Sequence, residues 1–438
     1  MDQAWLLPRS IHDFVPRDHP AHLVREIVRG ELDLSAILAA YERELRGFPP
    51  YHPAMMVALL LYAYSRGVSS SRQIARACEE RLDVIAVTAL QRPDFRTVSD
   101  FRKRHLVALG ELFAQVLTLC RAAGLVKLGH VALDGSKLQA SAAEHKAMSS
   151  ARMKQREVEL RAEVERWLEE AEQVDAAEDA ELGAARGDEL PPWVADKHKR
   201  LEKIRQAKAA LEAEAQAAVP AAEDDGVRPG PSSGMMAKGR PKRAADGRPP
   251  GRAQRNFTAP DSRILATRDG FVQGDNGQIA VDGHRQIITA HRLTTNAADD
   301  GALVPLVDAT TAALGRPPRE VSADAGLCNE DHLAALQARG IAGYLMPGRV
   351  RHHQPGDAGR RRIAPGSLMA AMAARLRRAA RRSRYRLRKQ IVEPVFGQIK
   401  AARGFRQFLL RGFDNARSEW PLICTVHNLT KLVSHRPA

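Results

Sequence analysis

Leu128-Gly-His-Val-Ala-Leu-Asp134-Gly135-Ser136 is the first stretch of this 438-residue chain with the pattern of a buried β-strand. Its apolar and β-compatible residues run into an Asp-Gly pair, which is typical of a core strand that ends in a tight turn. The sequence upstream has helical character, and strand-like sequence resumes only near residue 271. The stretch therefore predicts the first strand of a sheet, separated from the other strands by a long insertion.

From residue 271 onward the chain alternates between strand-like and helix-like segments. Strands are expected at 271–281, 286–293, 319–326 and 341–346, and helices at 301–314, at 329–339 and through the remainder. A turn that contains Gly283 joins the first two of these strands. This order predicts an α/β layer with a mixed sheet.

Residues 1–125 predict an all-α N-terminal domain. Pro53 starts an apolar helix that ends near Gly67. Thr97-Val-Ser-Asp100 resembles a capping box and predicts the start of a long helix through Arg121. The first two turns of that helix carry basic residues expected to contact DNA: Arg102, Lys103 and Arg104. A helix-turn-helix-like DNA-binding unit and a helical bundle with a solvated basic rim fit this pattern equally well.

The insertion holds two amphipathic stripes with three-four spacing. They consist of Met153, Leu160, Val164, Trp167, Ala171 and Val174, and of Val194, Leu201, Ile204, Leu211 and Ala215. An antiparallel helical hairpin over 149–218 would bury both stripes, and pairing between two chains is the alternative. Residues 219–256 predict a basic flexible linker rich in Pro, Gly, Ala and Arg. Within it, 238–243 resembles an AT-hook, although an ordinary charged linker explains the same residues.

Composition points to a polyanionic partner. The net charge is +15 and the sequence pI is near 10.0, which favours nucleic acid over the alternative of an ordinary basic enzyme. The cysteines form no CxxC pair, which argues against a zinc ribbon or a disulfide scaffold: Cys78, Cys120, Cys328 and Cys424. The longest apolar run, 55–64, is too short to cross a bilayer, and no signal peptide opens the chain. We expect a cytosolic protein.

The segment Gln390-Ile-Val-Glu393-Pro-Val-Phe-Gly-Gln-Ile-Lys400 places one carboxylate in an apolar stretch. A buried carboxylate needs a basic side chain or a metal ion as its partner. Between Arg349 and Lys389 the chain has fourteen Lys or Arg residues against one acidic residue, Asp357. A basic run of this density predicts a polyanion as its neutralising partner, and a solvated basic helix is the alternative.

Three carboxylates have the right settings for a metal site. Two-metal phosphoryl transfer needs carboxylates that hold divalent cations roughly 3.5–4 Å apart. Asp134 and Asp324 each lie where a β-compatible run meets a glycine, and Glu393 lies on or near the start of a helix. Neighbouring strands would bring the two Asp residues together. Asp-Gly is also a common turn, and other acidic residues have similar local settings: Asp275, Asp282, Asp299 and Asp300.

At these residues the sequence resembles a DDE transposase of a bacterial insertion sequence. Residues 51–105 are similar to the helical domain of such enzymes. Leu133-Asp-Gly-Ser-Lys137 resembles their first acidic motif, and Ala323-Asp-Ala-Gly326 the second. The segment 393–400, continued by Arg403-Gly-Phe-Arg406, resembles the third. The resemblance covers nearly the whole chain.

The resemblance implies a ribonuclease H-like catalytic domain made of 126–148 and 257–438, with Asp134, Asp324 and Glu393 as catalytic metal ligands. It also implies a Tyr-x2-Arg-x3-Glu-x6-Lys signature, to which Tyr385, Arg388 and Lys400 correspond. Here four residues rather than three separate Arg388 from Glu393. The expected contacts to DNA phosphate are Lys400, Arg388, Tyr385, Arg403, Arg381 and Arg382, together with the basic residues of the N-terminal helix.

The implied function is transposition. The enzyme would bind the terminal inverted repeats of its element, cleave the DNA there and transfer the strands. Mg²⁺ is the expected cofactor, and Mn²⁺ could substitute for Mg²⁺. Double-stranded DNA is the expected partner, a homodimer the expected active form, and the nucleoid of the cytoplasm the expected location. A different metal nuclease such as a junction resolvase, or a non-catalytic DNA-binding protein, is the alternative.

Overall fold

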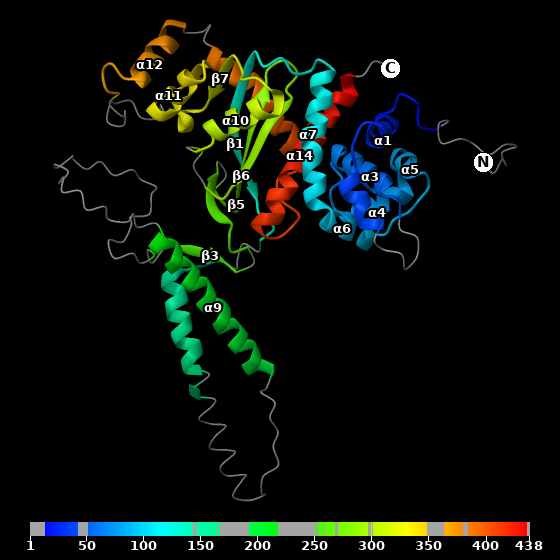
Figure 1. Cartoon of the computed structure of the whole chain (residues 1–438). Helices are drawn as coiled ribbons and strands as arrows, with labels where there is room; N and C mark the ends of the chain where they lie inside the picture. Colours follow the sequence, from blue (N-terminus) through cyan, green and yellow to red (C-terminus); the bar gives the residue numbers. More distant parts are fainter. Residues whose placement is uncertain are drawn as a thin grey trace, which may run out of the picture. The chain divides into compact units, whose positions relative to one another are not determined.

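The computed structural model (Figure 1) describes residues 14–42, 51–142, 147–163, 165–166, 192–217, 249, 253–257, 259–267, 270–296, 299, 301–347, 363–379 and 384–435. The chain divides into two compact units. One consists of Met1–Ser141 and Leu265–Ala438, and the other is Ala142–Ile264. The domain boundaries expected from the sequence stay predictions.

A mixed sheet forms the centre of the first unit. Its strands are β1 (His130–Gln139), β4 (Arg263–Thr267), β5 (Gly270–Asp282), β6 (Ile288–Thr294), β7 (Glu320–Ala323) and β8 (Ala342–Leu345). The strand order is β4-β5-β1-β7-β8, with β6 also paired to β5. β1 is antiparallel to β5 and parallel to β7, and β8 continues the parallel side. The predicted mixed sheet is confirmed, while β4 was not predicted.

β1 is the central strand, and it is longer than the sequence predicts. Val131, Ala132 and Leu133 are buried, as expected for a strand covered on both faces. The predicted turn at Asp134-Gly135 is wrong, because the pairing with β5 continues from Val131 opposite Asp282 to Gln139 opposite Gly274. The backbone ladder with β5 outweighs the local turn preference of Asp-Gly. Asp134 therefore lies in the middle of a strand.

The helices that follow the first hairpin pack on this sheet. They are α10 (Leu303–Leu314), α11 (Glu330–Ala338), α12 (Leu368–Ala379), α13 (Arg388–Gly397) and α14 (Phe413–His435). Short turns of 3-10 helix occur at Ala325–Leu327 and Arg384–Leu387, and a π-helical turn at Gln398–Ala402. α14 lies between the sheet and the N-terminal helix α7 (Leu106–Ala122) (Figure 1). Its residues Trp420, Leu422 and Val426 are fully buried there.

Pro394 lies inside α13, where it cannot donate the helical hydrogen bond to the carbonyl of Gln390. The side-chain amide of Gln286 supplies the missing donor, at 3.0 Å from the Gln390 oxygen. The proline is therefore tolerated because another part of the fold satisfies the freed carbonyl. This contact ties α13 to the turn between β5 and β6.

The N-terminal residues form α1 (Pro20–Gly30), α2 (Ser35–Glu42), α3 (Pro53–Ser65), α4 (Ser71–Glu80), α5 (Leu82–Thr88), α6 (Phe95–Arg104) and α7. The proline-started helix is confirmed as α3, and its residues from Met56 to Tyr64 are all buried. One hydrophobic core joins these helices to the sheet, from Ile27 in α1 to Val321 in β7. The helical part and the sheet are therefore packed as one body.

The single long helix predicted from Thr97 to Arg121 is wrong. α6 begins earlier because the Asp94 carboxylate accepts hydrogen bonds from the backbone N–H groups of Arg96 and Thr97. The chain then bends by 71° between α6 and α7. Among the described residues, no single helix is both long and apolar enough to span a membrane, although this bent pair would pass on length and composition together.

The second unit contains α9 (Pro192–Ala217), helical residues 150–163, and a two-stranded sheet of β2 (Ala147–Ser149) and β3 (Gln254–Asn256). Its core contains members of both predicted stripes: Met153, Leu160, Leu201, Ile204 and Leu211. Glu157 pairs with Lys208 at 2.9 Å and Glu163 with Lys197 at 2.8 Å, which shows antiparallel packing within one chain. Trp167–Val174 and the AT-hook-like segment lie outside the described residues.

Candidate active site

Asp134 and Asp324 meet because their strands are neighbours. In the parallel pairing of β1 with β7, Leu133 lies opposite Ala323, so the next residue of each strand is one of the two Asp residues. Asp324 follows the end of β7 and precedes the 3-10 turn, as the sequence predicts. The sheet topology thus brings together two carboxylates that are far apart in sequence.

Glu393 reaches the same place from α13, through the guanidinium of Arg388. Nη1 of Arg388 is 2.7 Å from Oδ2 of Asp134. Its Nη2 is 3.8 Å from Oδ1 of Asp324 and 3.5 Å from Oε1 of Glu393. We call Asp134, Asp324 and Glu393 the carboxylate cluster. The structure therefore brings the three predicted residues together, with Arg388 among them.

The expected burial of Glu393 is wrong. Its side chain is 47% exposed, whereas its neighbours Val392 and Val395 are fully buried. α13 packs its apolar side against the core, and Glu393 lies on the side that is open to solvent. The apolar residues next to Glu393 in sequence lie on the opposite, buried face of the same helix. An exposed carboxylate is better placed than a buried one to meet a large substrate.

Electrostatic conditions differ across the cluster. Burial raises the pKa of Asp134 to about 6, although Arg388 acts in the opposite direction. Burial by itself would lower the pKa of Arg388, but Asp134 and Asp324 raise it above its ordinary value. Nε of Arg388 is buried and has no hydrogen-bond partner among the described residues. The carboxylates therefore hold the guanidinium in place. Among the described residues, Arg388 is the only cationic side chain in contact with all three of them.

Lys400 and Tyr385 lie at the two sides of this site. Nζ of Lys400 donates to Oγ of Ser136 at 3.0 Å and to the carbonyl of Lys137 at 2.8 Å, just beyond Asp134 on β1. The guanidinium of Arg388 lies 6.0 Å from the ring centre of Tyr385. Burial and the nearby Arg406 lower the pKa of Lys400. The extra residue between Arg388 and Glu393 does not prevent their contact.

The remaining predicted DNA contacts have different positions. Arg102 is buried and donates to the Tyr64 hydroxyl at 3.0 Å and to the Ser69 carbonyl at 2.8 Å, so its prediction as a DNA contact is wrong. Lys103 and Arg104 are exposed on α6. Arg403 is half-buried and its guanidinium donates to the His427 ring at 3.4 Å. Arg381 and Arg382 lie outside the described residues.

Asp299, which the sequence analysis names only as one of several acidic residues with a similar local setting, lies beside Gly135. Its Oδ1 accepts hydrogen bonds from the side-chain amides of Asn276, at 2.6 Å, and Gln278, at 2.9 Å. Its charge also contributes to raising the pKa of Asp134. In the sequence Asp299 has the same local setting as the other acidic residues of this region. The alternation of Asn276 and Gln278, which puts two amides on one face of β5, is the signal that could have identified it.

Gly135 is required by this contact and not by a turn. A methyl group at residue 135 would contact the Asp299 carboxylate and would lie 3.0 Å from Oδ1 of Asn276. Gly135→Ala should therefore displace Asp299 and lower the free energy of unfolding by about 1–3 kcal/mol, the usual cost of overpacking. Urea denaturation measures this, with Gly301→Ala as the control because nothing lies within 4 Å of that position. Equal stability of the two variants would contradict the role assigned to Gly135.

The donors of the cluster fit a hard divalent cation, because Mg²⁺ prefers oxygen ligands and carboxylates above all. Within the described part of the chain, no three His, Cys, Asp or Glu side chains are already arranged to hold a metal ion. The Arg388 guanidinium lies among the three carboxylates, where a metal ion bound by all three would also lie. All four cysteines are buried and free, and none lies in the cluster.

Comparison with known families agrees with this arrangement. Residues 9–104 match a transposase domain (DUF772), and residues 360–433 match a transposase DDE domain that includes Glu393 and Lys400. No curated protein and no solved structure matches the chain. A DDE domain implies a ribonuclease H-like fold, with which the mixed sheet is consistent. The chain is a DDE transposase of an insertion element, an enzyme that cleaves DNA and transfers its strands.

Proposed function

We propose that this transposase binds the terminal inverted repeats of its own element and cleaves them in a Mg²⁺-dependent reaction. Water hydrolyses the phosphodiester at the element end and leaves a 3′-hydroxyl, which then displaces a 3′-oxygen in target DNA and joins the two strands. The observation that carries this proposal is the convergence of Asp134, Asp324 and Glu393 on one guanidinium. They approach one another from β1, from the end of β7 and from α13, as separate parts of the chain do when they build a metal site.

The carboxylate cluster would hold the divalent ions, with Mg²⁺ as the physiological choice and Mn²⁺ as its substitute. A divalent cation bound there supplies an activated water and stabilises negative charge on the leaving oxygen. Asp134 and Asp324 are fixed by the sheet, so their separation is set by strand pairing. Glu393 is carried on a separate helix and is exposed, so it can adjust when DNA and metal arrive.

Arg388 has two tasks in this proposal. Without metal, it holds together three negative charges that would otherwise repel one another. With a cation bound by the three carboxylates, the Arg388 guanidinium would be free to bind a DNA phosphate, for which its planar fork is well suited. Lys400, fixed to β1 beside Ser136, would bind a neighbouring phosphate.

Other parts of the chain would bind and position the element. Lys103 and Arg104 are exposed on α6, where they would contact the terminal repeat together with the other N-terminal helices. Arg403 would contribute its charge near the cluster, and Arg381 and Arg382 belong to the same basic segment of the sequence. The second unit would support dimer assembly. The enzyme would act on the nucleoid in the cytoplasm.

The direct test uses the purified chain and a labelled duplex that carries an end of its element. With Mg²⁺ or Mn²⁺ we expect cleavage at the element end, a 3′-hydroxyl product, and joining of that product to a target plasmid. Chelation by EDTA should stop both steps. Cleavage of branched DNA in preference to element ends would instead indicate a junction resolvase, and specific binding without cleavage under either metal would indicate a regulator.

A further inference from the structure

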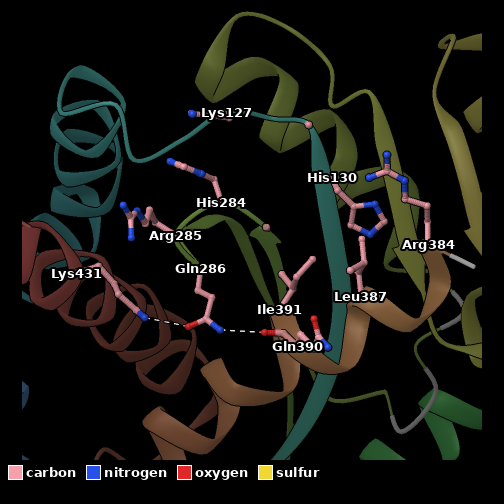
Figure 2. Close-up of a pocket in the computed structure, with 12 residues that line it drawn as sticks. Lys127, His130, His284, Arg285, Gln286, Arg384, Leu387, Gln390, Ile391 and Lys431 are labelled. Carbon is pink, nitrogen blue, oxygen red and sulfur yellow. Dashed lines mark hydrogen bonds between the residues drawn. The ribbon is translucent and has the colours of Figure 1, made fainter. Parts of the chain in front are cut away.

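A basic pocket of about 630 Å³ lies beside the start of β1, and none of the three cluster carboxylates lines it (Figure 2). Its walls come from the segment before β1, the turn between β5 and β6, the residues around the start of α13, and the end of α14. Its basic side chains are Lys127, His284, Arg285, Arg384 and Lys431. Basic groups from four separate parts of the chain thus surround one hollow.

The carboxylates nearest to this pocket are already engaged. Asp282 accepts hydrogen bonds from the backbone N–H groups of Leu128, at 2.6 Å, and His284, at 2.9 Å. Glu320 contacts the His130 ring at 3.0 Å and Arg384 at 3.4 Å. For the remaining cations of the described pocket the structure shows no carboxylate partner. Among the described residues, the Asp282 carboxylate raises the pKa of His284 but forms no ion pair with the Lys and Arg side chains of the pocket.

The pKa values of His284 and Lys431 are lowered in part by the positive charges of neighbouring side chains. Burial lowers the pKa of His284, and Lys127 and Arg285 lower it further. Burial and Arg403 lower the pKa of Lys431. An anion in the pocket would reverse the part of these shifts that comes from like charges.

The floor of the pocket is rigidly built. Gln286 has a backbone φ of 59°, which is unusual for a residue other than glycine. Its carbonyl accepts from the His427 ring at 2.8 Å. Its Oε1 accepts from Lys431 at 2.9 Å, and its side-chain amide donates to the carbonyl of Gln390 (Figure 2). Strained residues that are held by several contacts often mark binding sites. The position of Lys431 in particular is fixed before any ligand arrives.

The pocket and the carboxylate cluster share two elements. His130 precedes Asp134 by four residues on β1 and lies on the same face of the strand, at roughly 13 Å. Ile391 lines the pocket from α13, the helix that also carries Arg388 and Glu393. One DNA strand could therefore contact both places, because the separation corresponds to about four base pairs of rise.

We propose that this basic pocket binds backbone phosphates of the DNA whose scissile phosphodiester lies at the carboxylate cluster, an inference that rests on the proposed function. The described lining residues include no Phe, Tyr or Trp, and one of its two imidazole rings, that of His130, is held by Glu320 and Ser322, so few of its side chains could stack on a base. Lys and Arg side chains make many of their DNA contacts with phosphate oxygens, and these contacts fix the register of the DNA without reading its sequence. The pocket therefore sets the register of the DNA and not the choice of sequence.

The test compares the variant Lys127→Gln/Arg285→Gln with wild type in binding a fluorescent duplex over a series of salt concentrations. Each lost phosphate contact lowers the slope of log affinity against log salt by about one, so we expect a decrease of about two. The control is Arg411→Gln/Arg417→Gln, which removes the same charge from exposed positions outside both the pocket and the N-terminal helices and should leave the slope at its wild-type value. A wild-type slope in the pocket variant, with normal duplex binding, would overturn the pocket and leave the proposed function intact.

A second measurement needs no variant. In wild-type protein, the exposed Lys127 should be protected from acetylation by the duplex and not by inorganic phosphate at the same phosphate concentration. Equal protection by both would show a site for free phosphate and overturn the proposal. If wild-type protein binds no duplex at all, the proposed function and the pocket fail together.

Discussion

Asp324→Asn and Glu393→Gln should each abolish DNA cleavage while leaving the fold and duplex binding unchanged. The side chains of Asp324 and Glu393 are 43% and 47% exposed and neither belongs to the hydrophobic core, so each substitution should remove a proposed metal ligand without a packing defect. Metal catalysis contributes several kcal/mol to the barrier, so the cleavage rate should fall at least about 10³-fold. The rate is measured on a labelled element end under saturating Mg²⁺.

Asp331→Asn is the matched control for these substitutions. Asp331 is an exposed carboxylate of α11 in the same unit, outside the cluster, and its loss should leave cleavage near the wild-type rate. Binding of the same duplex in EDTA separates a catalytic defect from a DNA-binding defect. Cleavage that survives both Asp324→Asn and Glu393→Gln would remove the assigned site.

Arg388→Met should destabilise the metal-free protein by about 3 kcal/mol, since removal of one partner of a buried ion pair leaves the other charge uncompensated. The side chains of Arg388 and Asp134 are only 12% and 18% exposed. Mg²⁺ should restore part of the lost stability, because it replaces the guanidinium as the shared positive charge. Urea denaturation with and without Mg²⁺ measures both effects.

The pH dependence of this loss has a definite sign. The folded-state pKa of Asp134 is raised, to about 6, so its ionisation opposes folding as the pH rises through that value. Above pH 6 the Asp134 carboxylate is ionised and needs the Arg388 guanidinium as its partner, whereas below pH 6 it is protonated. The loss of unfolding free energy caused by Arg388→Met should therefore be larger above pH 6 than below it. Arg388→Met combined with Asp134→Asn should recover most of the stability in EDTA. An Arg388→Met protein as stable as wild type above pH 6, without metal, would contradict the role of Arg388.

The sequence was sufficient for those elements whose local signals agree with their pairing. The strands and helices from 271 to 346 are separated by glycines and caps, and the structure confirms each of them within a few residues. The adjacency of Asp134 and Asp324 follows from two such strands lying side by side. For these residues, the local sequence pattern and the long-range strand pairing favour the same secondary structure.

Elements that depend on distant partners could not be predicted. Asp134-Gly135 has the local chemistry of a turn, and only its pairing with β5 keeps it extended. The short strand β4 has no strong signal of its own and exists through its hydrogen bonds to β5. The helix α6 begins after Asp94, whose carboxylate caps it. The sequence offers two possible N-caps, Asp94 and Thr97, and does not decide between them.

The candidate site was predicted in its residues but not in its arrangement. Spacing in sequence could not show that Arg388 lies among the carboxylates, because that contact joins a helix to two strands. It could not show that Glu393 is exposed, since its neighbours in sequence are apolar. Asp299 could not be selected from the other acidic residues, and the basic pocket was not predicted, because both depend on side chains from separate parts of the chain.

We propose that Asp134, Asp324 and Glu393 together hold one divalent-metal site. Its most direct test replaces Mg²⁺ with Fe²⁺ and adds ascorbate and peroxide, so that radicals formed at the bound ion cut the nearby protein backbone. We predict fragments that end close to these three residues and disappear when excess Mg²⁺ competes. Backbone cuts elsewhere, or no cuts that Mg²⁺ suppresses, would contradict the claim.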